Sequence, residues 1–157
     1  MSKICCFTGH RKIKTMSVSE ISAKLEKVLI ELIEVENFTD FRAGGAVGFD
    51  SIAALTVLKL KERYPHIKLH LILPCADQDY RFSPLEKQIY RYTKARADSV
   101  QILQKHYTSG IMHVRNRALV DGTDLCIAFL EKLEGGTYYT VNYARKNKVK
   151  TINLLKI

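Results

Sequence analysis

A glycine-rich segment, Gly44 to Asp50, has the composition of a turn that approaches a bound phosphate. Gly44, Gly45, Ala46 and Gly48 precede Asp50 and an apolar pattern typical of a helix. Glycine has no Cβ, so a chain rich in it can turn tightly and come close to a ligand. The free N–H groups and positive dipole end of the following helix favour an anion at the same place. We therefore interpret the segment as an anion site; the alternative is a tight turn whose glycines serve packing alone.

A second segment near the carboxyl end repeats this pattern. Gly135, Gly136 and Thr137 stand at the expected start of another helix. The hydroxyl of Thr137 suits either a phosphate or the helix N-terminus, where threonine is a common cap. Two such segments predict a site in which one holds a phosphate and the other faces a sugar or a second phosphate.

A third segment supplies a cation and a titratable ring. Gly9, His10 and Arg11 follow the first expected strand. A guanidinium can bind a phosphate through two parallel hydrogen bonds. Histidine, with a reference pKa of about 6.5, can act as a general acid or base. The alternative for His10 is a hydrogen bond to the backbone.

A fourth group, Arg115-Asn116-Arg117, falls within a short expected helix. Positions 115 and 117 are separated by about 200° around a helix, so we expect only one arginine to face a ligand. The other would face the surface or a carboxylate such as Asp121. Asn116 can form hydrogen bonds with a base or a ribose, and the alternative for the group is a solvated helix face.

The pattern of apolar residues predicts the elements that position these segments. Strands are expected at 3–8, 40–43, 68–73, 99–103, 125–130 and 151–155, and helices at 18–36, 50–63, 84–97, 111–120 and 137–146. This alternation predicts one α/β domain over residues 1–157, Rossmann-like, with a mainly parallel sheet of about six strands and helices on both faces. Ligands of such folds bind beyond the carboxyl ends of the strands, where the glycine-rich segments would meet.

Composition restricts the class of protein. The chain has 157 residues and a net charge of +9, which suits anionic partners from a small phosphate to nucleic acid. It lacks an apolar run of about 18 residues, so we expect no membrane span and a cytoplasmic protein. The cysteines, Cys5, Cys6, Cys75 and Cys126, lie in apolar runs without CxxC spacing. We expect reduced, structural thiols and no metal site.

The motifs, in this order, resemble the SLOG superfamily, and most closely its YpsA-like branch. The resemblance rests on residues 6–11, 44–50, 74–78, 115–121 and 135–137, and covers nearly the whole chain. It implies a Rossmann-like fold and a pocket for nucleotides or nucleotide-derived ligands such as AMP, NAD or ADP-ribose. It leaves a homo-oligomer open.

Two relatives of that superfamily define alternative functions. The LOG phosphoribohydrolases carry a catalytic glutamate after a glycine-threonine pair, and here residues 135–140 provide none. His10, Asp50 and Asp121 are the catalytic candidates for a nucleotide-cleaving enzyme. The DNA-processing protein DprA uses the domain to bind single-stranded DNA. The leading expectation is a nucleotide-binding sensor or regulatory module, with these two as alternatives.

Overall fold

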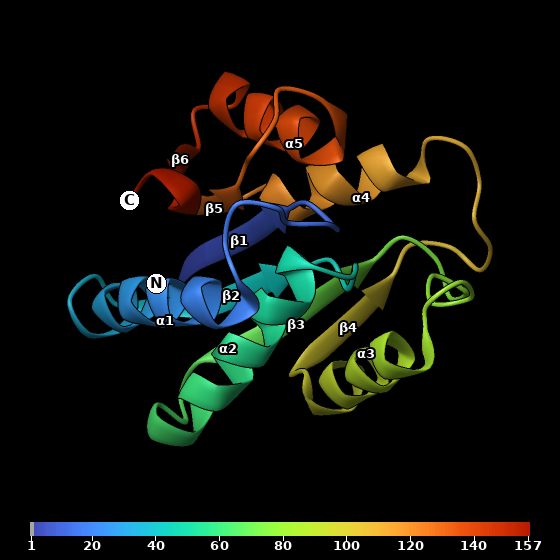
Figure 1. Ribbon diagram of the computed structural model, residues 1–157. Helices are drawn as coiled ribbons and strands as arrows, with labels where there is room; N and C mark the ends of the chain where they lie inside the picture. The colour runs from blue at the N-terminus through green and yellow to red at the C-terminus, as the bar shows by residue number, and fades with distance from the viewer. Residues whose placement is uncertain (1) are drawn as a thin grey trace.

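The computed structural model describes residues 2–157 and contains one six-stranded parallel sheet (Figure 1). The strands are β1 (Lys3–Gly9), β2 (Phe38–Ala43), β3 (Lys68–Leu73), β4 (Ser99–Ile102), β5 (Leu125–Phe129) and β6 (Lys150–Asn153). The helices are α1 (Val18–Glu34), α2 (Phe49–Arg63), α3 (Pro84–Arg96), α4 (Ile111–Val120), α5 (Gly135–Lys146) and a 3₁₀ turn, Leu154–Lys156. The expected α/β, Rossmann-like class is confirmed, with every α-helix and strand boundary within two residues of its prediction.

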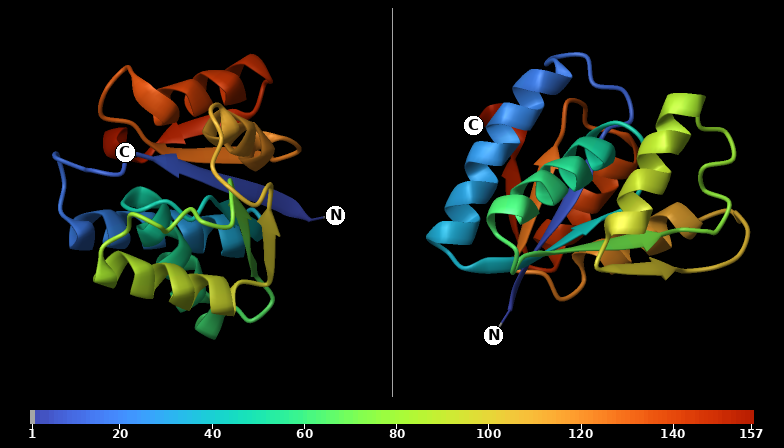
Figure 2. Two further views of the ribbon diagram at one scale, coloured as in Figure 1. Left: turned by 90° about the vertical axis from the view of Figure 1, so that its right-hand side faces the viewer. Right: turned by 90° about the horizontal axis from the view of Figure 1, so that it is seen from below.

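Helices cover both faces of the sheet. Figure 2 shows α1, α2 and α3 on one face and α4 and α5 on the other. The central strands are apolar because both of their faces are covered; every residue of β5 is buried. Four phenylalanine rings fill the core between the sheet and α2: Phe7, Phe41, Phe49 and Phe129.

The strands lie in the order β4-β3-β2-β1-β5-β6, so the topological switch point of the sheet lies between β1 and β5. From β1 the chain proceeds outward to β4, then crosses to β5 and proceeds outward to β6. Gly9 pairs with Phe129, so β1 and β5 end at the same level. Open α/β sheets bind their ligands in the crevice at this point. The topology therefore directs attention to the segments after β1 and β5.

The starts of three helices differ in how they are capped. The Ser17 hydroxyl accepts from the Glu20 N–H at 3.2 Å, and Ser83 forms a reciprocal capping box with Glu86. Both caps match the serine and glutamate spacing in the sequence. In contrast, α5 begins at Gly135, two residues before the expected start, and Glu134 gives it no side-chain cap. Among residues 2–157, no side chain therefore caps the first turn of α5.

At the other boundaries, local backbone conformation explains the small differences. α1 ends at Glu34 rather than residue 36, and Asn37 then adopts a left-handed conformation with φ of 62°. Asparagine tolerates this conformation better than most residues. The turn places the ring of Phe38 in the core, so β2 begins two residues early. Within residues 2–157, no helix is long and apolar enough to cross a membrane.

A candidate ligand-binding cleft at the carboxyl edge of the sheet

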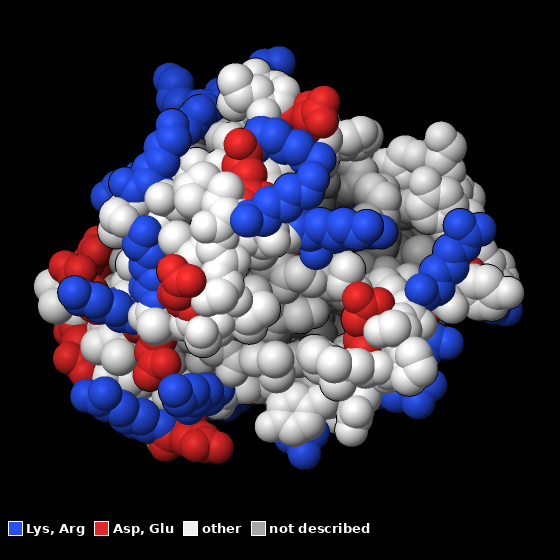
Figure 3. Space-filling view, in the orientation of Figure 1, with Lys and Arg blue, Asp and Glu red and all other residues white. Residues whose placement is uncertain are grey.

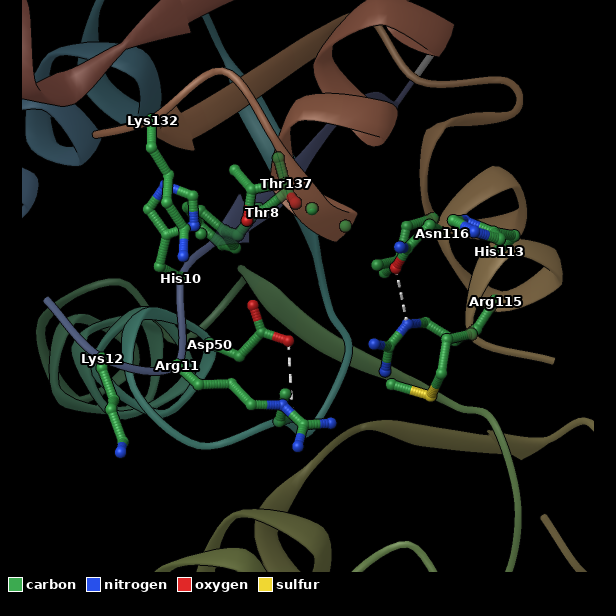
Figure 4. Close-up of a pocket in the computed structure, with 17 residues that line it drawn as sticks. Thr8, His10, Arg11, Lys12, Asp50, His113, Arg115, Asn116, Lys132 and Thr137 are labelled. Atoms are coloured by element: carbon green, nitrogen blue, oxygen red, sulfur yellow. Dashed lines mark hydrogen bonds between the residues drawn. The ribbon is translucent and has the colours of Figure 1, made fainter. Parts of the chain in front are cut away.

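A cavity of about 560 Å³ lies at the switch point, between the ends of β1 and β5 and the starts of α2 and α5. Ten of the fourteen expected ligand-binding residues line it: Gly9, His10, Arg11, Ala46, Asp50, Arg115, Asn116, Gly135, Gly136 and Thr137. Figure 4 shows His10 and Lys132 on one side, Arg115 and Asn116 on the other, and Asp50 between them. The fold thus brings together segments from four separate parts of the chain.

The N-terminus of α5 opens into this cavity. Gly135 has φ of 85°, and a Cβ added to it would meet no atom within 4 Å. A Cβ on Gly136 would meet only Asn116 Nδ2, at 3.6 Å. The first turn of α5 therefore faces open space, with no side-chain cap in front of it. Free N–H groups and a positive dipole end directed into a cavity make a favourable place for an anion.

The glycines after β2 do not line the cavity, in contrast to Gly135 and Gly136. A Cβ on Gly44 would lie 2.6 Å from the Arg115 guanidinium, and one on Gly45 would lie 2.5 Å from Leu73. A Cβ on Gly48 would lie 2.4 Å from the carbonyl oxygen of Arg11. These three glycines allow the backbone to pack against its neighbours, which is the alternative that the sequence left open.

Two N–H groups of this segment donate to neighbours within the protein. The N–H of Ala46 donates to Asp50 Oδ2 at 3.3 Å, and that of Phe49 donates to the His10 carbonyl at 3.2 Å. Of this segment, two residues line the cavity, Ala46 and Asp50. The bond from Ala46 positions the carboxyl group of Asp50.

Asp50 and Arg115 form a buried pair of opposite charges across the cavity wall. Burial raises the pKa of Asp50, against the charge of Arg115 and the N–H of Ala46, which favour the ionised form. Burial likewise lowers the pKa of Arg115, and the carboxylate of Asp50 opposes the change. Arg115 donates to the carbonyl of Gly44 and, from Nε, to Asn116 Oδ1 at 3.0 Å. The second bond fixes the amide of Asn116 with Nδ2 towards Gly136.

His10 is held by the backbone. Its Nε2 accepts from the N–H of Glu131 at 2.9 Å, so the ring proton lies on Nδ1. Burial lowers the pKa of His10, although the nearby carboxylate of Glu131 opposes this. A neutral ring with an occupied Nε2 suits positioning of the chain after β5, and its Nδ1–H remains a donor for a ligand.

Two expected residues lie elsewhere. Arg117 donates to the Tyr139 hydroxyl at 2.7 Å and is absent from the cavity wall, so one arginine of the pair faces the site, as the helical spacing predicts. Asp121 accepts from the Tyr143 hydroxyl at 2.6 Å, beyond the far end of α4, in another depression of the surface. Asp121 is therefore remote from the groups that would act on a ligand here.

Several cavity residues went unrecognised in the sequence. Lys12 and Lys132 add cations, and Thr8 and His113 add polar groups. The lysines stand next to Arg11 and close to Gly135, and that proximity was their only sequence signal. Figure 3 shows Lys and Arg side chains on two sides of a hollow in this face.

A second hollow, of about 770 Å³, adjoins the first on the side of β3 and α3. Arg11, Lys12 and Met112 line both hollows. Its other wall carries Gln78, from the segment after β3, and three aromatic rings: Tyr80, Phe82 and Tyr107.

Solved structures of DNA processing protein A have the same fold. The Streptococcus pneumoniae protein matches 96% of this chain with a TM-score of 0.69 at 17% identity. The Helicobacter pylori protein, whose structure concerns its single-stranded DNA binding mode, matches 95% with a TM-score of 0.64 at 18% identity. This chain spans about half of the S. pneumoniae chain, 49%, and 63% of the H. pylori chain. At these identities the likeness concerns the fold.

Sequence comparison identifies the family. The chain is 32% identical over 146 residues to an SPbeta prophage-derived protein of Bacillus subtilis, YoqJ, covering 85% of each. It is 29% identical over 144 residues to a UPF0398 protein of Bacillus pumilus, covering 86% of this chain and 77% of that protein. The model of the YspA SLOG family matches residues 5–157, which confirms the resemblance in the motifs. The chain therefore belongs to the YspA SLOG family.

Proposed function

We propose that this protein binds a nucleotide or nucleotide-derived phosphate ligand in the cleft at the carboxyl edge of the sheet, and that it acts as a sensor or regulatory module. The observation that carries the proposal is the first turn of α5, which opens uncapped into a cavity lined by cations. The phosphate would lie against Gly135, Gly136 and Thr137, where backbone N–H groups and the helix dipole favour negative charge.

The charges of the cavity wall fit this placement. Four cations, Arg11, Lys12, Arg115 and Lys132, face one carboxyl group, Asp50. Because two of the cations come from the loop after β1 and one from the loop after β5, they surround the start of α5 from two sides. A phosphate monoester, with a charge of roughly −1.5 to −2 at neutral pH, would partly neutralise this excess.

The polar groups beside the phosphate position suit a sugar and a base. Asp50 has one oxygen engaged by the Ala46 N–H, and its other oxygen points into the cavity in Figure 4. An acceptor in that position suits a ribose hydroxyl. Asn116, whose Nδ2 faces Gly136, supplies a donor beside the phosphate.

Binding of AMP and adenosine, measured by calorimetry, tests the proposal. We expect AMP to bind at least about tenfold more tightly than adenosine, because a charge-assisted hydrogen bond contributes roughly 1.5–3 kcal/mol. Equal affinity for the two would place the phosphate outside the cavity, and failure of AMP, NAD and ADP-ribose alike to bind would overturn the proposal.

Cleavage of a nucleotide is the second candidate function, and the environment of Asp50 favours it. A buried carboxyl group with a raised pKa in a cavity is a common form of general acid. Release of free base or ribose phosphate from AMP or ADP-ribose, lost in Asp50→Asn, would establish this activity. Binding without release in the unchanged protein would leave the cleft a binding site.

A further inference from the structure

The second hollow is lined by rings that are unusually open to solvent. Tyr80 is 78% exposed and Tyr107 is 62% exposed, and both line the hollow of about 770 Å³. Phe82 is held in place beside them, edge-to-face against Tyr90 with 5.6 Å between ring centres. Exposed aromatic faces in a concave surface are well suited to stack on a planar ring, whatever its identity.

Gln78, which lines this hollow, has a buried acceptor without a partner among the described residues. Gln78 Nε2 donates to the carbonyl of Gly44 at 3.2 Å, which fixes the orientation of the amide. Its Oε1 is buried and has no hydrogen-bond partner among residues 2–157. The hydroxyl of Tyr90, a side chain that is 5% exposed, is likewise buried and unpartnered in this part of the chain. Both atoms are buried behind the wall of the hollow, with Gln78 Oε1 only 3.1 Å from the position of a Cβ on Gly45, so they are a cost of the packing there and the hollow itself offers its aromatic rings.

The two hollows differ in the balance of their charges. The first contains four cations and one carboxyl group. The second contains three cations, Arg11, Lys12 and Arg81, and two carboxyl groups, Asp77 and Glu86. An anionic group would therefore be drawn more strongly to the first hollow, whereas the second offers aromatic faces to a planar ring. The shared wall of Arg11, Lys12 and Met112 sets the two side by side.

We propose that the two hollows form one bipartite site whose ligand carries a ring system on each side of its phosphate: the first ring lies near Asp50, the phosphate at α5, and the second ring between Tyr80 and Tyr107. This inference rests on the proposed phosphate site and specifies its ligand class. The chemistry is that of a free dinucleotide-type compound or of adjoining nucleotides in a single strand of DNA.

Paired titrations of the full chain test the inference. The probes are AMP and ADP-ribose, which each carry one base, and NAD and a short thymidylate strand, which each carry a base-like ring on both sides of a phosphate. We expect at least one two-sided ligand to bind about tenfold or more tightly than AMP, as stacking of one base allows. In Tyr80→Ala/Tyr107→Ala we expect this advantage to be lost and the affinity for AMP to be unchanged.

Tyr92→Ala provides the matched control. Tyr92 is also exposed and lies on α3, but its ring stacks with Arg96 and lines neither hollow. We expect this variant to bind every probe as the unchanged protein does. Loss of the advantage in Tyr92→Ala as well would overturn the assignment to the second hollow.

The outcomes separate this inference from the proposed function. AMP binding as tightly as every two-sided ligand, or a double tyrosine variant with unaltered preferences, overturns the bipartite site and leaves the phosphate site standing. Absence of binding by all probes overturns both. Tight binding of the strand alone, falling steeply with salt, supports the bipartite site and identifies its occupant as DNA. Tight binding of NAD, well above that of ADP-ribose, supports it with a free ligand, and equal affinity for NAD and ADP-ribose counts against a second ring in the second hollow.

Discussion

Replacement of Gly136 by alanine should weaken ligand binding without harming the fold. Gly136 lies in the first turn of α5 and lines the cavity. Its φ is not in the left-handed region, and the new methyl group would meet only Asn116 Nδ2, at an ordinary contact distance of 3.6 Å. The methyl group would therefore cause no clash in the free protein, but it would occupy space directly in front of the N–H groups that we assign to the phosphate.

The two effects have opposite signs. Glycine in a helix is less stable than alanine by roughly 0.5–1 kcal/mol, and in the first turn we expect a gain of about 0.5 kcal/mol. For a domain of this size that is an increase in Tm of roughly 1–2 °C. We expect the affinity for AMP to fall by at least about tenfold. At a concentration 100 times the original Kd, the ligand would then stabilise the protein by about 1.4 rather than about 2.7 kcal/mol.

Thermal unfolding with and without AMP measures both effects in one experiment. Gly122→Ala is a matched control with the reverse expectation. Gly122 has φ of 78° and open space around its Cβ position, so alanine there introduces backbone strain at a position outside the cleft wall. Its Tm should fall while its ligand-induced shift persists. A full shift in Gly136→Ala would refute the placement of the phosphate, and a lowered Tm in that variant would refute the steric argument.

Three further predictions concern charge. In Arg115→Met, Asp50 loses the cation that opposes the effect of burial, so the pKa of Asp50 rises further. A carboxyl group with a raised pKa stabilises the fold at low pH and loses this stabilisation as pH rises. Urea unfolding should therefore show a variant about 3 kcal/mol less stable than the unchanged protein at pH 8, with a smaller deficit at pH 5. A deficit independent of pH would contradict this coupling. Lys132→Ala should weaken AMP binding roughly tenfold in calorimetry. Its Tm should be unchanged, because the side chain of Lys132 is exposed. Unchanged affinity for AMP would show that Lys132 does not belong to the site. Burial raises the pKa of Asp40, but hydrogen bonds, including one with His70 at 2.7 Å, outweigh burial and hold this pKa below its usual value. Asp40 therefore stabilises the fold above about pH 4 and loses this effect as pH falls. Asp40→Asn should therefore reduce stability at pH 7 and flatten its decline between pH 5 and pH 3, and an unaltered profile in acid denaturation would contradict the assignment.

The fold was predictable because its main determinants are local. Apolar runs such as Leu125–Phe129, helical spacing such as that in Val18–Glu34, and the Ser83 capping box each predict an element from adjacent residues alone. Strands that alternate with helices then restrict the sheet to parallel pairing. The start of α5 was displaced because the sequence favoured Thr137 as a cap, whereas the helix begins at Gly135 without one.

The roles of the glycines were less predictable because they depend on distant residues. A glycine in the sequence does not show which atoms, if any, occupy the space where a side chain would be. At Gly44 the neighbour is the guanidinium of Arg115, and at Gly45 it is a methyl group of Leu73. At Gly136 the space in front is open. The helical spacing likewise predicted that one arginine of the pair would face the site, but which one depended on the packing of α4 against the sheet.

The burial of Asp50 is the observation that a purely structural account of the cleft must explain. Buried opposite charges are often no more stabilising than apolar residues of similar size, so Asp50 and Arg115 are not needed for a stable core. A structural role is available, since an acid in the first turn of α2 benefits from the helix dipole and accepts the N–H of Ala46. That role engages one carboxyl oxygen and would be served as well by an exposed acid. A cap alone does not require the carboxyl group to face a cavity that is otherwise positively charged, whereas a ribose hydroxyl beside a phosphate does.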